Sequence, residues 1–269
     1  MGGVTTEPIP LRRRLLAEFL GSAFLAALVI GSGIAAQRLS PGQTGLELME
    51  NAAATAAGLF AIILMFGPVS GGHFNPVVSF ADAAFGGLSW RDAAAYLPTQ
   101  VVGCTAGAVA ANLMFELPAV SISTKHRASG AHFLSEVIAT AGLLLVIFAL
   151  APSGRGSSAP AAVGAYIGAA YWFTSSTSFA NPAITVGRMF SDTFAGIAPS
   201  SVLSFIGAQI IGGALAVAAI KALYPAITPA DAASIIVPHG TGTTAELARA
   251  AHDGTAPSAD QPTGPPRAG

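Results

Sequence analysis

Long runs of apolar residues, separated by shorter polar stretches, recur six times along the 269-residue chain. Their approximate ranges are 15–36, 52–69, 93–114, 132–151, 159–177 and 201–223. An α-helix rises 1.5 Å per residue, so roughly 20 residues cross the hydrocarbon core of a bilayer. The pattern therefore predicts six transmembrane helices.

Two weakly apolar stretches, 67–87 and 175–199, follow the second and the fifth of these runs. Each contains an Asn-Pro pair, in the tripeptides Asn75-Pro76-Val77 and Asn181-Pro182-Ala183. Asparagine is a favoured N-cap and proline fits the first helical position, so each pair predicts the start of a short helix. Because about ten helical residues cannot cross a bilayer, we expect each helix to enter and leave on the same side, surrounded by protein and water.

The two halves of the chain, about 15–114 and 132–223, resemble each other beyond these tripeptides. The other matched pairs are Glu18 with Glu136 and Gln100 with Gln209. Three spans per half insert the second half upside down, and inverted repeats place their functional site where interrupted helices meet at the midplane. Two positive half-helix ends are therefore predicted to face each other there.

Composition agrees with a membrane protein, because 52% of the residues are hydrophobic and only 9% are charged, against roughly 25% charged in soluble proteins. A formal charge of −1 without a basic patch gives no indication of nucleic-acid binding. The single cysteine, Cys104, lies in an apolar run, so neither a disulfide framework nor a cysteine metal site is expected. No nucleophile, metal cluster or acid–base pair is evident, so we expect neither an enzyme nor a cofactor.

Basic residues favour one orientation in the membrane. With both termini in the cytoplasm, eight of the twelve Lys and Arg residues lie inside, beginning with Arg12–Arg14. The four that remain outside are Arg38, Lys125, Arg127 and Arg188. The run 15–36 is longer than a signal-peptide core, so we interpret it as the first span. Residues 1–14 then form a cytoplasmic segment, and the Pro-, Gly- and Thr-rich residues 224–269 a flexible cytoplasmic tail.

The segments around the two Asn-Pro pairs, 70–77 (Ser-Gly-Gly-His-Phe-Asn-Pro-Val) and 178–183 (Ser-Phe-Ala-Asn-Pro-Ala), resemble the signature loops of the aquaporin family. The resemblance covers roughly residues 12–223 and includes the matched Glu and Gln positions. It implies an all-α membrane protein, a right-handed bundle of six transmembrane helices plus two re-entrant half-helices with an inverted internal repeat. It further implies a passive channel in the plasma (inner) membrane, a homotetramer with one pore per subunit, in which Asn75 and Asn181 donate hydrogen bonds to the passing solute.

Glu18 and Glu136 are acidic groups within predicted spans, and an acid inside a membrane is a functional candidate by default. Their possible roles are a proton relay or a structural anchor that accepts hydrogen bonds from the re-entrant backbone. Their occurrence at equivalent positions favours the anchor, and the resemblance implies the same role. His73 is interpreted as a partner that holds the first loop, because no Cys or second His lies at metal-ligand spacing.

Counting from the two asparagines, four positions correspond to the narrowest part of an aquaporin pore. They are Thr55, Ala169, Ser178 and Ile184. The family usually has an arginine at the last of these positions, so an isoleucine there implies a wider opening without a fixed cation. The two hydroxyl groups can still exchange hydrogen bonds with a hydroxylated solute. The constriction is therefore expected to admit small neutral molecules somewhat larger than water.

A bacterial branch of the family associated with arsenic resistance is similar in having an aliphatic residue at this position and a run like residues 188–197. The similarity implies arsenous acid or its methylated forms as solutes, besides water and glycerol. The alternatives are a general water and glycerol facilitator with no arsenic role, and a gradient-coupled secondary transporter.

Arg188 lies four residues beyond Ile184, about 6 Å further along the same helix face. Because helical side chains lean toward the N-terminus, its guanidinium can reach back to the constriction. The alternative is a charge at the external mouth that pairs with Asp192, also four residues away. The sequence leaves both readings open.

Overall fold

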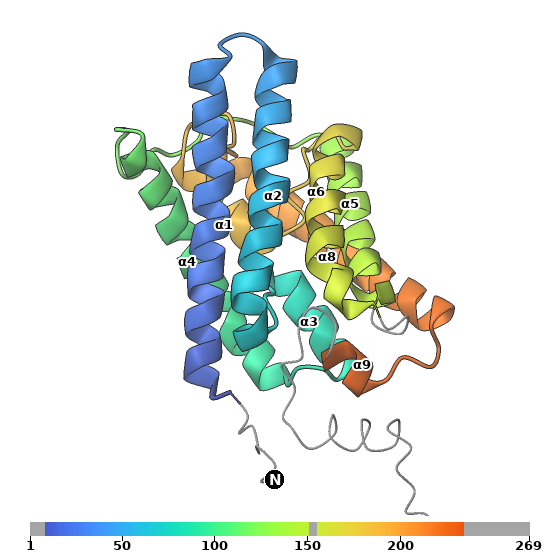
Figure 1. The fold of residues 1–269 in the computed structure, drawn as a ribbon. Coiled ribbons are helices and arrows are strands. Elements are labelled where there is room, and N and C mark those ends of the chain that lie inside the picture. Colours follow the sequence, from blue (N-terminus) through green and yellow to red (C-terminus); the bar gives the residue numbers. More distant parts are fainter. Residues whose placement is uncertain (1–8, 151–154, 234–269) are drawn as a thin grey trace, which may run out of the picture.

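The computed structural model describes residues 9–150 and 155–233, and this part of the chain consists of helices joined by loops (Figure 1). Its six main helices are α1 (Leu11–Leu39), α2 (Thr44–Ser70), α4 (Trp90–Met114), α5 (Gly130–Leu150), α6 (Ala159–Phe173) and α8 (Pro199–Leu223). The short elements are α3 (Pro76–Phe85), η1 (Gly156–Ser158), α7 (Pro182–Gly187), η2 (Arg188–Phe190) and α9 (Pro229–Ala233). The predicted all-α architecture, with two half-helices that begin at the Asn-Pro pairs, is confirmed.

Helix α2 begins at Thr44, well before the predicted start at residue 52. Its first turns contain polar side chains, which make this part of the sequence less hydrophobic than the rest of the helix. These side chains nevertheless form hydrogen bonds within the fold. Glu47 accepts a hydrogen bond from the Gly42 backbone, and the Asn51 amide donates to the Val29 carbonyl of α1 at 2.9 Å. Satisfied polar groups therefore extend the helix beyond its apolar run.

Four helices, α1, α2, α5 and α8, are apolar and long enough to cross a membrane by length and composition alone. Helix α4 has 25 residues but carries polar groups such as Arg91, Asp92 and Gln100. Helix α6 has only 15 residues and ends at Phe173 instead of the predicted residue 177.

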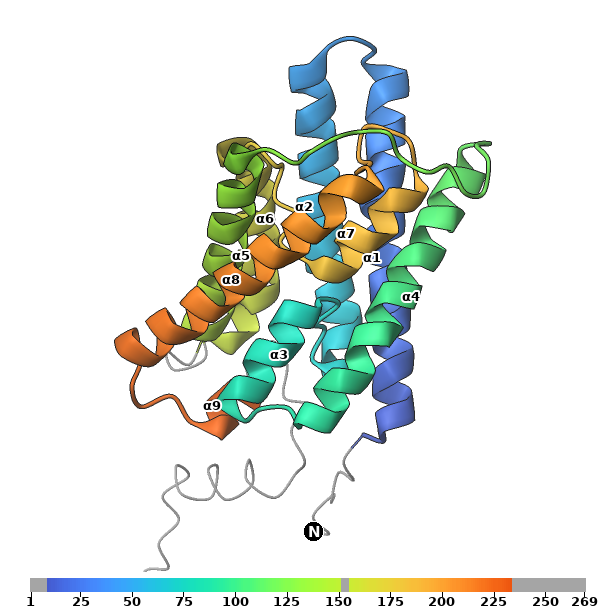
Figure 2. The ribbon, with the colours of Figure 1, turned by 180° about the vertical axis from the view of Figure 1, so that it is seen from behind.

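The two halves adopt the same arrangement. In the first half α1 packs against α2 and α4, and in the second half α5 packs against α6 and α8. The half-helices α3 and α7 point toward each other from opposite ends of the bundle (Figure 2). One end of the bundle carries the loops 40–43, 115–129 and 191–198, and is called the loop end here. The start of α1 and the helix α9 lie at the other end (Figure 1).

Equivalent glycines allow the long helices of each half to cross closely. A Cβ atom on Gly103 of α4 would lie 2.5 Å from the Phe19 carbonyl oxygen of α1. A Cβ atom on Gly212 of α8 would lie 2.5 Å from the Val137 carbonyl oxygen of α5. Real Cβ atoms do not approach backbone this closely, so both crossings depend on glycine.

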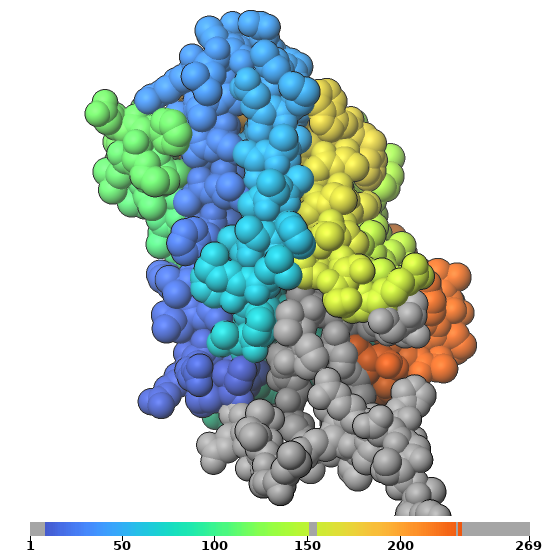
Figure 3. All heavy atoms as spheres, in the orientation of Figure 1, coloured from blue at the N-terminus to red at the C-terminus, as the bar shows by residue number. Residues whose placement is uncertain are grey.

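The outer faces of the main helices expose large apolar side chains, and α1, α2 and α6 form one continuous face (Figure 3). Prominent examples are Phe24, Leu64, Met65, Trp172, Leu203 and Ile210. An exposed apolar surface of this extent is suited to lipid or to other subunits rather than to water.

The predicted flexible tail begins later than residue 224. Residues 224–233 are part of the described structure, and Ala232 of α9 is fully buried. Pro229 lies close to Gly86, which ends α3 in a left-handed conformation. The prediction of a flexible tail is therefore wrong for residues 224–233, because apolar contacts with α3 hold them. The remaining tail, 234–269, lies outside the described residues, as do residues 1–8.

Candidate solute pathway between two half-helices

Each asparagine of the Asn-Pro pairs caps its own half-helix. The Asn75 side-chain oxygen accepts the Val77 amide proton at 3.0 Å, and the Asn181 oxygen accepts that of Ala183 at 2.9 Å. The following prolines occupy the first helical position, where a missing N–H costs nothing. Both helix starts that the Asn-Pro pairs predict are thus present in the structure.

The same asparagines also join the two half-helices to each other. The Asn75 amide nitrogen donates to the Ala180 carbonyl oxygen at 2.8 Å, and the Asn181 nitrogen donates to the Phe74 carbonyl oxygen at 2.7 Å. Each amide nitrogen carries a second N–H group, and both asparagines line the central cavity. The two tips therefore meet inside the bundle and present donors to whatever fills the cavity.

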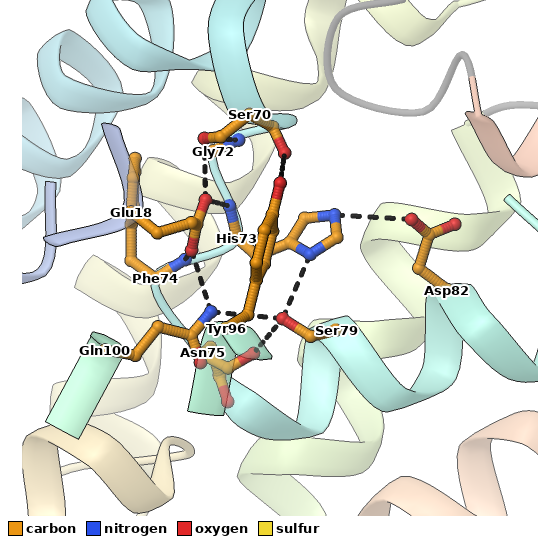
Figure 4. Close-up of polar contacts among 10 residues, drawn as sticks. All are labelled: Glu18, Ser70, Gly72, His73, Phe74, Asn75, Ser79, Asp82, Tyr96 and Gln100. Carbon is orange, nitrogen blue, oxygen red and sulfur yellow. Dashed lines mark hydrogen bonds and ion pairs between the residues drawn. The ribbon is translucent and has the colours of Figure 1, made fainter. Parts of the chain in front are cut away.

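Glu18 of α1 holds the backbone that leads into α3 (Figure 4). One carboxylate oxygen accepts from the Ser70 hydroxyl at 2.6 Å and the His73 amide at 3.0 Å. The other accepts from the Phe74 amide and the Gln100 side chain, both at 2.7 Å. The fully buried carboxylate thus has four donors, which offset the cost of its burial.

Glu136 of α5 makes the equivalent contacts in the second half. One oxygen accepts from the Ser176 hydroxyl at 2.6 Å and the Phe179 amide at 2.9 Å. The other accepts from the Ala180 amide at 2.8 Å and the Gln209 side chain at 2.7 Å. The matched Glu and Gln positions of the sequence repeat therefore carry the same hydrogen-bond pattern.

His73 belongs to the loop before α3, and its ring contacts that helix (Figure 4). Its Nδ1 atom is 3.0 Å from the Ser79 hydroxyl, and its Nε2 atom is 3.4 Å from an Asp82 carboxylate oxygen. Its ring also lines the central cavity. Across the described residues, no group of three or more His, Cys, Asp or Glu side chains is placed to hold a metal ion.

The central cavity runs past both asparagines and has a largely apolar wall from α1, α2, α5 and α6. That wall includes Leu25, Val29, Leu59, Ile63, Leu143 and Ile147. Three of the four predicted constriction residues, Thr55, Ser178 and Ile184, also line it. The structure thus brings these three together with the asparagines around one space.

Ala169 is the exception, because it is exposed on the outer side of α6 and does not line the cavity. The helix instead turns Val163, Ile167 and Tyr171 inward. Helix α6 ends early, and the loop before Asn181 is irregular, so counting back from the asparagine loses the helical register. The placement of Ala169 at the constriction is therefore corrected.

Tyr171 is the cavity residue that spacing from the asparagine missed. Its hydroxyl lies 3.2 Å from the Thr55 hydroxyl across the α2–α6 contact. The Ser178 hydroxyl is also buried, and among the described residues it has no hydrogen-bond partner. Val163, Ile167 and Tyr171 recur every four residues, and this helical spacing could have identified the tyrosine.

Arg188 also lines the cavity, and it is 2% exposed. Its Nε atom donates to the Ala195 carbonyl oxygen, and its guanidinium carbon lies 3.4 Å from the centroid of the Phe179 ring. Asp192 instead accepts hydrogen bonds from the Thr124 backbone and hydroxyl. The alternative of an Arg188–Asp192 pair is thus not what the structure shows.

Two capped half-helices joined tip to tip inside an apolar bundle, beside a cavity with few polar groups, define a membrane channel of the half-helix type. Residues 6–179 match the model of the Major intrinsic protein family, which is more than half of the chain. The chain belongs to this family, whose members are passive channels rather than enzymes. It is therefore a multi-pass membrane protein and a channel for small solutes of the water and glycerol type.

Individual relatives agree with this assignment. The chain is 45% identical over 223 residues to Aquaglyceroporin AqpS of Rhizobium meliloti (strain 1021), covering 83% of this chain and 95% of that protein. It is 30% identical over 253 residues to the probable aquaporin TIP5-1 of Oryza sativa subsp. japonica, covering 86% of this chain and 93% of that protein. The fold is similar to the X-ray structure of the aquaglyceroporin from Plasmodium falciparum, with a TM-score of 0.64 at 21% identity over 81% of this chain and 99% of that one.

Proposed function

We propose that the channel selects its solutes at a constriction formed by Thr55, Tyr171, Ser178 and Ile184, with Arg188 beside it. We further propose that trivalent arsenicals, arsenous acid or its methylated forms, pass together with water and glycerol. The observation that carries the proposal is Ile184, an aliphatic side chain that lines the cavity where the family usually has arginine.

The chemistry of these side chains suits a compact, neutral, hydroxylated molecule. Three hydroxyl groups, those of Thr55, Tyr171 and Ser178, can each donate and accept a hydrogen bond. Ile184 supplies an apolar part of the same cavity wall. Glycerol and arsenous acid both carry three hydroxyl groups on a small core, so each can exchange its hydration for these contacts.

Exclusion of cations is ascribed to positive groups along the path. The N-terminal ends of α3 and α7 meet at the two asparagines, and each carries the partial positive charge of a helix N-terminus. Arg188 adds a full charge at the loop-end side of Ile184. Charge of this sign repels protons and metal cations while leaving neutral solutes free to pass.

We also propose a homotetramer in the plasma membrane with both termini in the cytoplasm. Support comes from the exposed apolar side chains of α1, α2, α5 and α6, which exceed what a soluble surface carries. The position of Arg14, paired with Asp92 at 2.7 Å near the start of α1, agrees with a basic cytoplasmic end.

The proposal is tested with purified protein in liposomes. Uptake of water, glycerol, arsenite and methylarsenite is followed by stopped-flow light scattering, with empty liposomes as reference. We expect all four to exceed the reference. Rapid glycerol uptake with arsenite at the reference rate would establish the general facilitator instead. Uptake that requires a proton or sodium gradient would establish the secondary transporter.

A further inference from the structure

A hollow at the loop end of the bundle lies outside the central cavity and is lined by α2, α5 and the loops 115–129, 174–181 and 191–198. Four of its lining residues are basic: Lys125, His126, Arg127 and His132. None of its lining residues is Asp or Glu. We call this hollow the basic vestibule.

The basic vestibule adjoins the solute path. It includes Leu48 of α2, which lies two helical turns before Thr55 on the same face. It also includes Thr177, the neighbour of the constriction residue Ser178. The Arg127 guanidinium carbon lies 5.3 Å from the centroid of the Phe179 ring, which lines the central cavity. A solute that leaves the constriction toward the loop end therefore meets these basic groups.

The cationic groups are fixed by backbone carbonyls rather than neutralised by carboxylates. Lys125 Nζ donates to the Phe194 carbonyl oxygen at 3.0 Å, and Arg127 Nε donates to that of Gly196 at 2.9 Å. Neither cation has an ion pair among the described residues. Two charges are therefore held in place without a directly paired carboxylate in the described part of the chain.

The carboxylates that act on Lys125 and Arg127 are hydrogen-bonded to other groups, Glu136 to the loop before α7 and the other two as follows. Asp192 accepts hydrogen bonds from Thr124, and Glu47 accepts the backbone amide of Gly42. Burial lowers the pKa of Lys125, and the charges of Arg127 and Arg188 lower it further, while Asp192 and Glu47 raise it. Among the charged groups that act on Lys125, the two guanidinium groups therefore outweigh the two carboxylates.

The two histidines place their imidazole rings at the same hollow. His126 Nδ1 lies 3.2 Å from the Ser200 hydroxyl, and His132 Nδ1 lies 2.9 Å from that of Ser129. Within residues 9–150 and 155–233, neither Nε2 atom has a hydrogen-bond partner. Each imidazole can thus offer its second nitrogen to a ligand.

We propose that the basic vestibule binds a small tetrahedral oxyanion, of which inorganic phosphate is the simplest, and that the bound anion obstructs the passage of neutral solutes. A hollow lined by one sign of charge concentrates counter-ions. An ammonium group and imidazole N–H groups form charge-assisted hydrogen bonds with oxyanion oxygens. The vestibule is open to water, so we expect a dissociation constant of about 1 to 10 mM.

Binding and obstruction are measured separately, because the obstruction rests on the proposed channel function. Titration calorimetry of the purified protein in detergent, with inorganic phosphate as the ligand, measures binding. Glycerol uptake into liposomes, with phosphate or with chloride at equal ionic strength on both sides, measures obstruction. Sulfate serves as a second tetrahedral dianion.

Two variants are designed to remove anion-binding groups of the basic vestibule while leaving the fold intact. Lys125→Gln keeps a donor for the Phe194 carbonyl but removes the charge, and the double variant His126→Ala with His132→Ala removes both imidazoles. Arg38→Gln is the matched control. It changes a basic residue of the loop end that donates to the Phe115 carbonyl and does not line the vestibule.

We expect phosphate and sulfate, but not chloride, to lower glycerol uptake at least about twofold at saturation, and both site variants to weaken binding about tenfold. Arg38→Gln is expected to bind like the parent protein. Absence of binding heat, or an equal loss in Arg38→Gln, overturns the site. Binding without any change in glycerol uptake overturns the obstruction. If the parent protein passes no glycerol, the proposed channel function fails while calorimetry still decides the site.

Discussion

The guanidinium carbon of Arg188 lies 3.4 Å from the centroid of the Phe179 ring, and both side chains line the central cavity. A cation over an aromatic face is stabilised by the ring quadrupole, by about 2 kcal/mol or more when both are desolvated. The ring and the Ala195 carbonyl therefore hold the arginine beside Ile184, one helical turn beyond the usual arginine position of the family. In this way the chain keeps a positive charge on the cavity wall that also carries Ile184 of the proposed constriction.

Removal of this charge is expected to weaken the exclusion of cations. In Arg188→Ala, sodium or potassium leak into liposomes should rise several-fold, because the barrier loses its full charge. Glycerol uptake should stay equal or increase. Arg188→Lys is the control, since it keeps the charge, and its leak should stay near that of the parent protein. An unchanged leak in Arg188→Ala would show that the half-helix ends alone exclude cations.

Introduction of arginine at the constriction is expected to narrow it. Ile184→Arg replaces an aliphatic side chain of the cavity wall with a longer, charged one. Uptake of glycerol and arsenite should fall about tenfold or more relative to water, because steric discrimination of this kind is worth roughly 1 to 3 kcal/mol. Ile184→Val, which keeps the aliphatic character, should preserve the ratio. Equal glycerol-to-water ratios in Ile184→Arg and the parent would place the selective step elsewhere.

The sequence predicted the elements that carry strong local signals and missed those set by tertiary contacts. Both Asn-Pro pairs begin half-helices, because capping and proline geometry are local effects. The start of α2 was missed because polar side chains there are satisfied by contacts with α1 and the 40–43 loop. Counting residues back from Asn181 selects Ala169 instead of Tyr171. The reason is that the loop between α6 and Asn181 has an irregular backbone, so the number of residues in it does not determine which face of α6 lines the cavity.

Neutralisation of either buried glutamate is expected to destabilise the protein. A glutamine at position 136 has one oxygen instead of two and turns an NH₂ group toward backbone donors, so at least one buried donor loses its acceptor. We expect Glu136→Gln to cost about 2 to 4 kcal/mol, and Glu18→Gln a similar amount. Thermal unfolding in detergent measures the loss. Glu116→Gln, at an exposed loop position, should change little.

Loss of the tyrosine hydroxyl is expected to alter solute preference without unfolding the protein. Tyr171→Phe removes the partner of the Thr55 hydroxyl and one donor on the path. One hydrogen bond contributes about 1 kcal/mol net, so the ratio of glycerol to water uptake should fall about fivefold. Tyr166→Phe is a matched control on the same helix, because that hydroxyl donates to the Ala139 carbonyl away from the cavity. A parallel change in both variants would indicate a structural effect instead.

Substitution of the crossing glycines tests whether close helix packing holds the pathway open. In Gly103→Leu the new side chain meets the Phe19 backbone of α1, which cannot move aside without displacing Glu18 and the loop it anchors. We expect a loss of about 1 to 3 kcal/mol in stability together with lower uptake of every solute. Gly207→Ala in α8 is the control, because no atom lies near its Cβ position and alanine favours a helix more than glycine does. A stable Gly103→Leu protein with normal uptake would mean that the α1–α4 contact tolerates separation, and that the carboxylate anchors alone fix the half-helices.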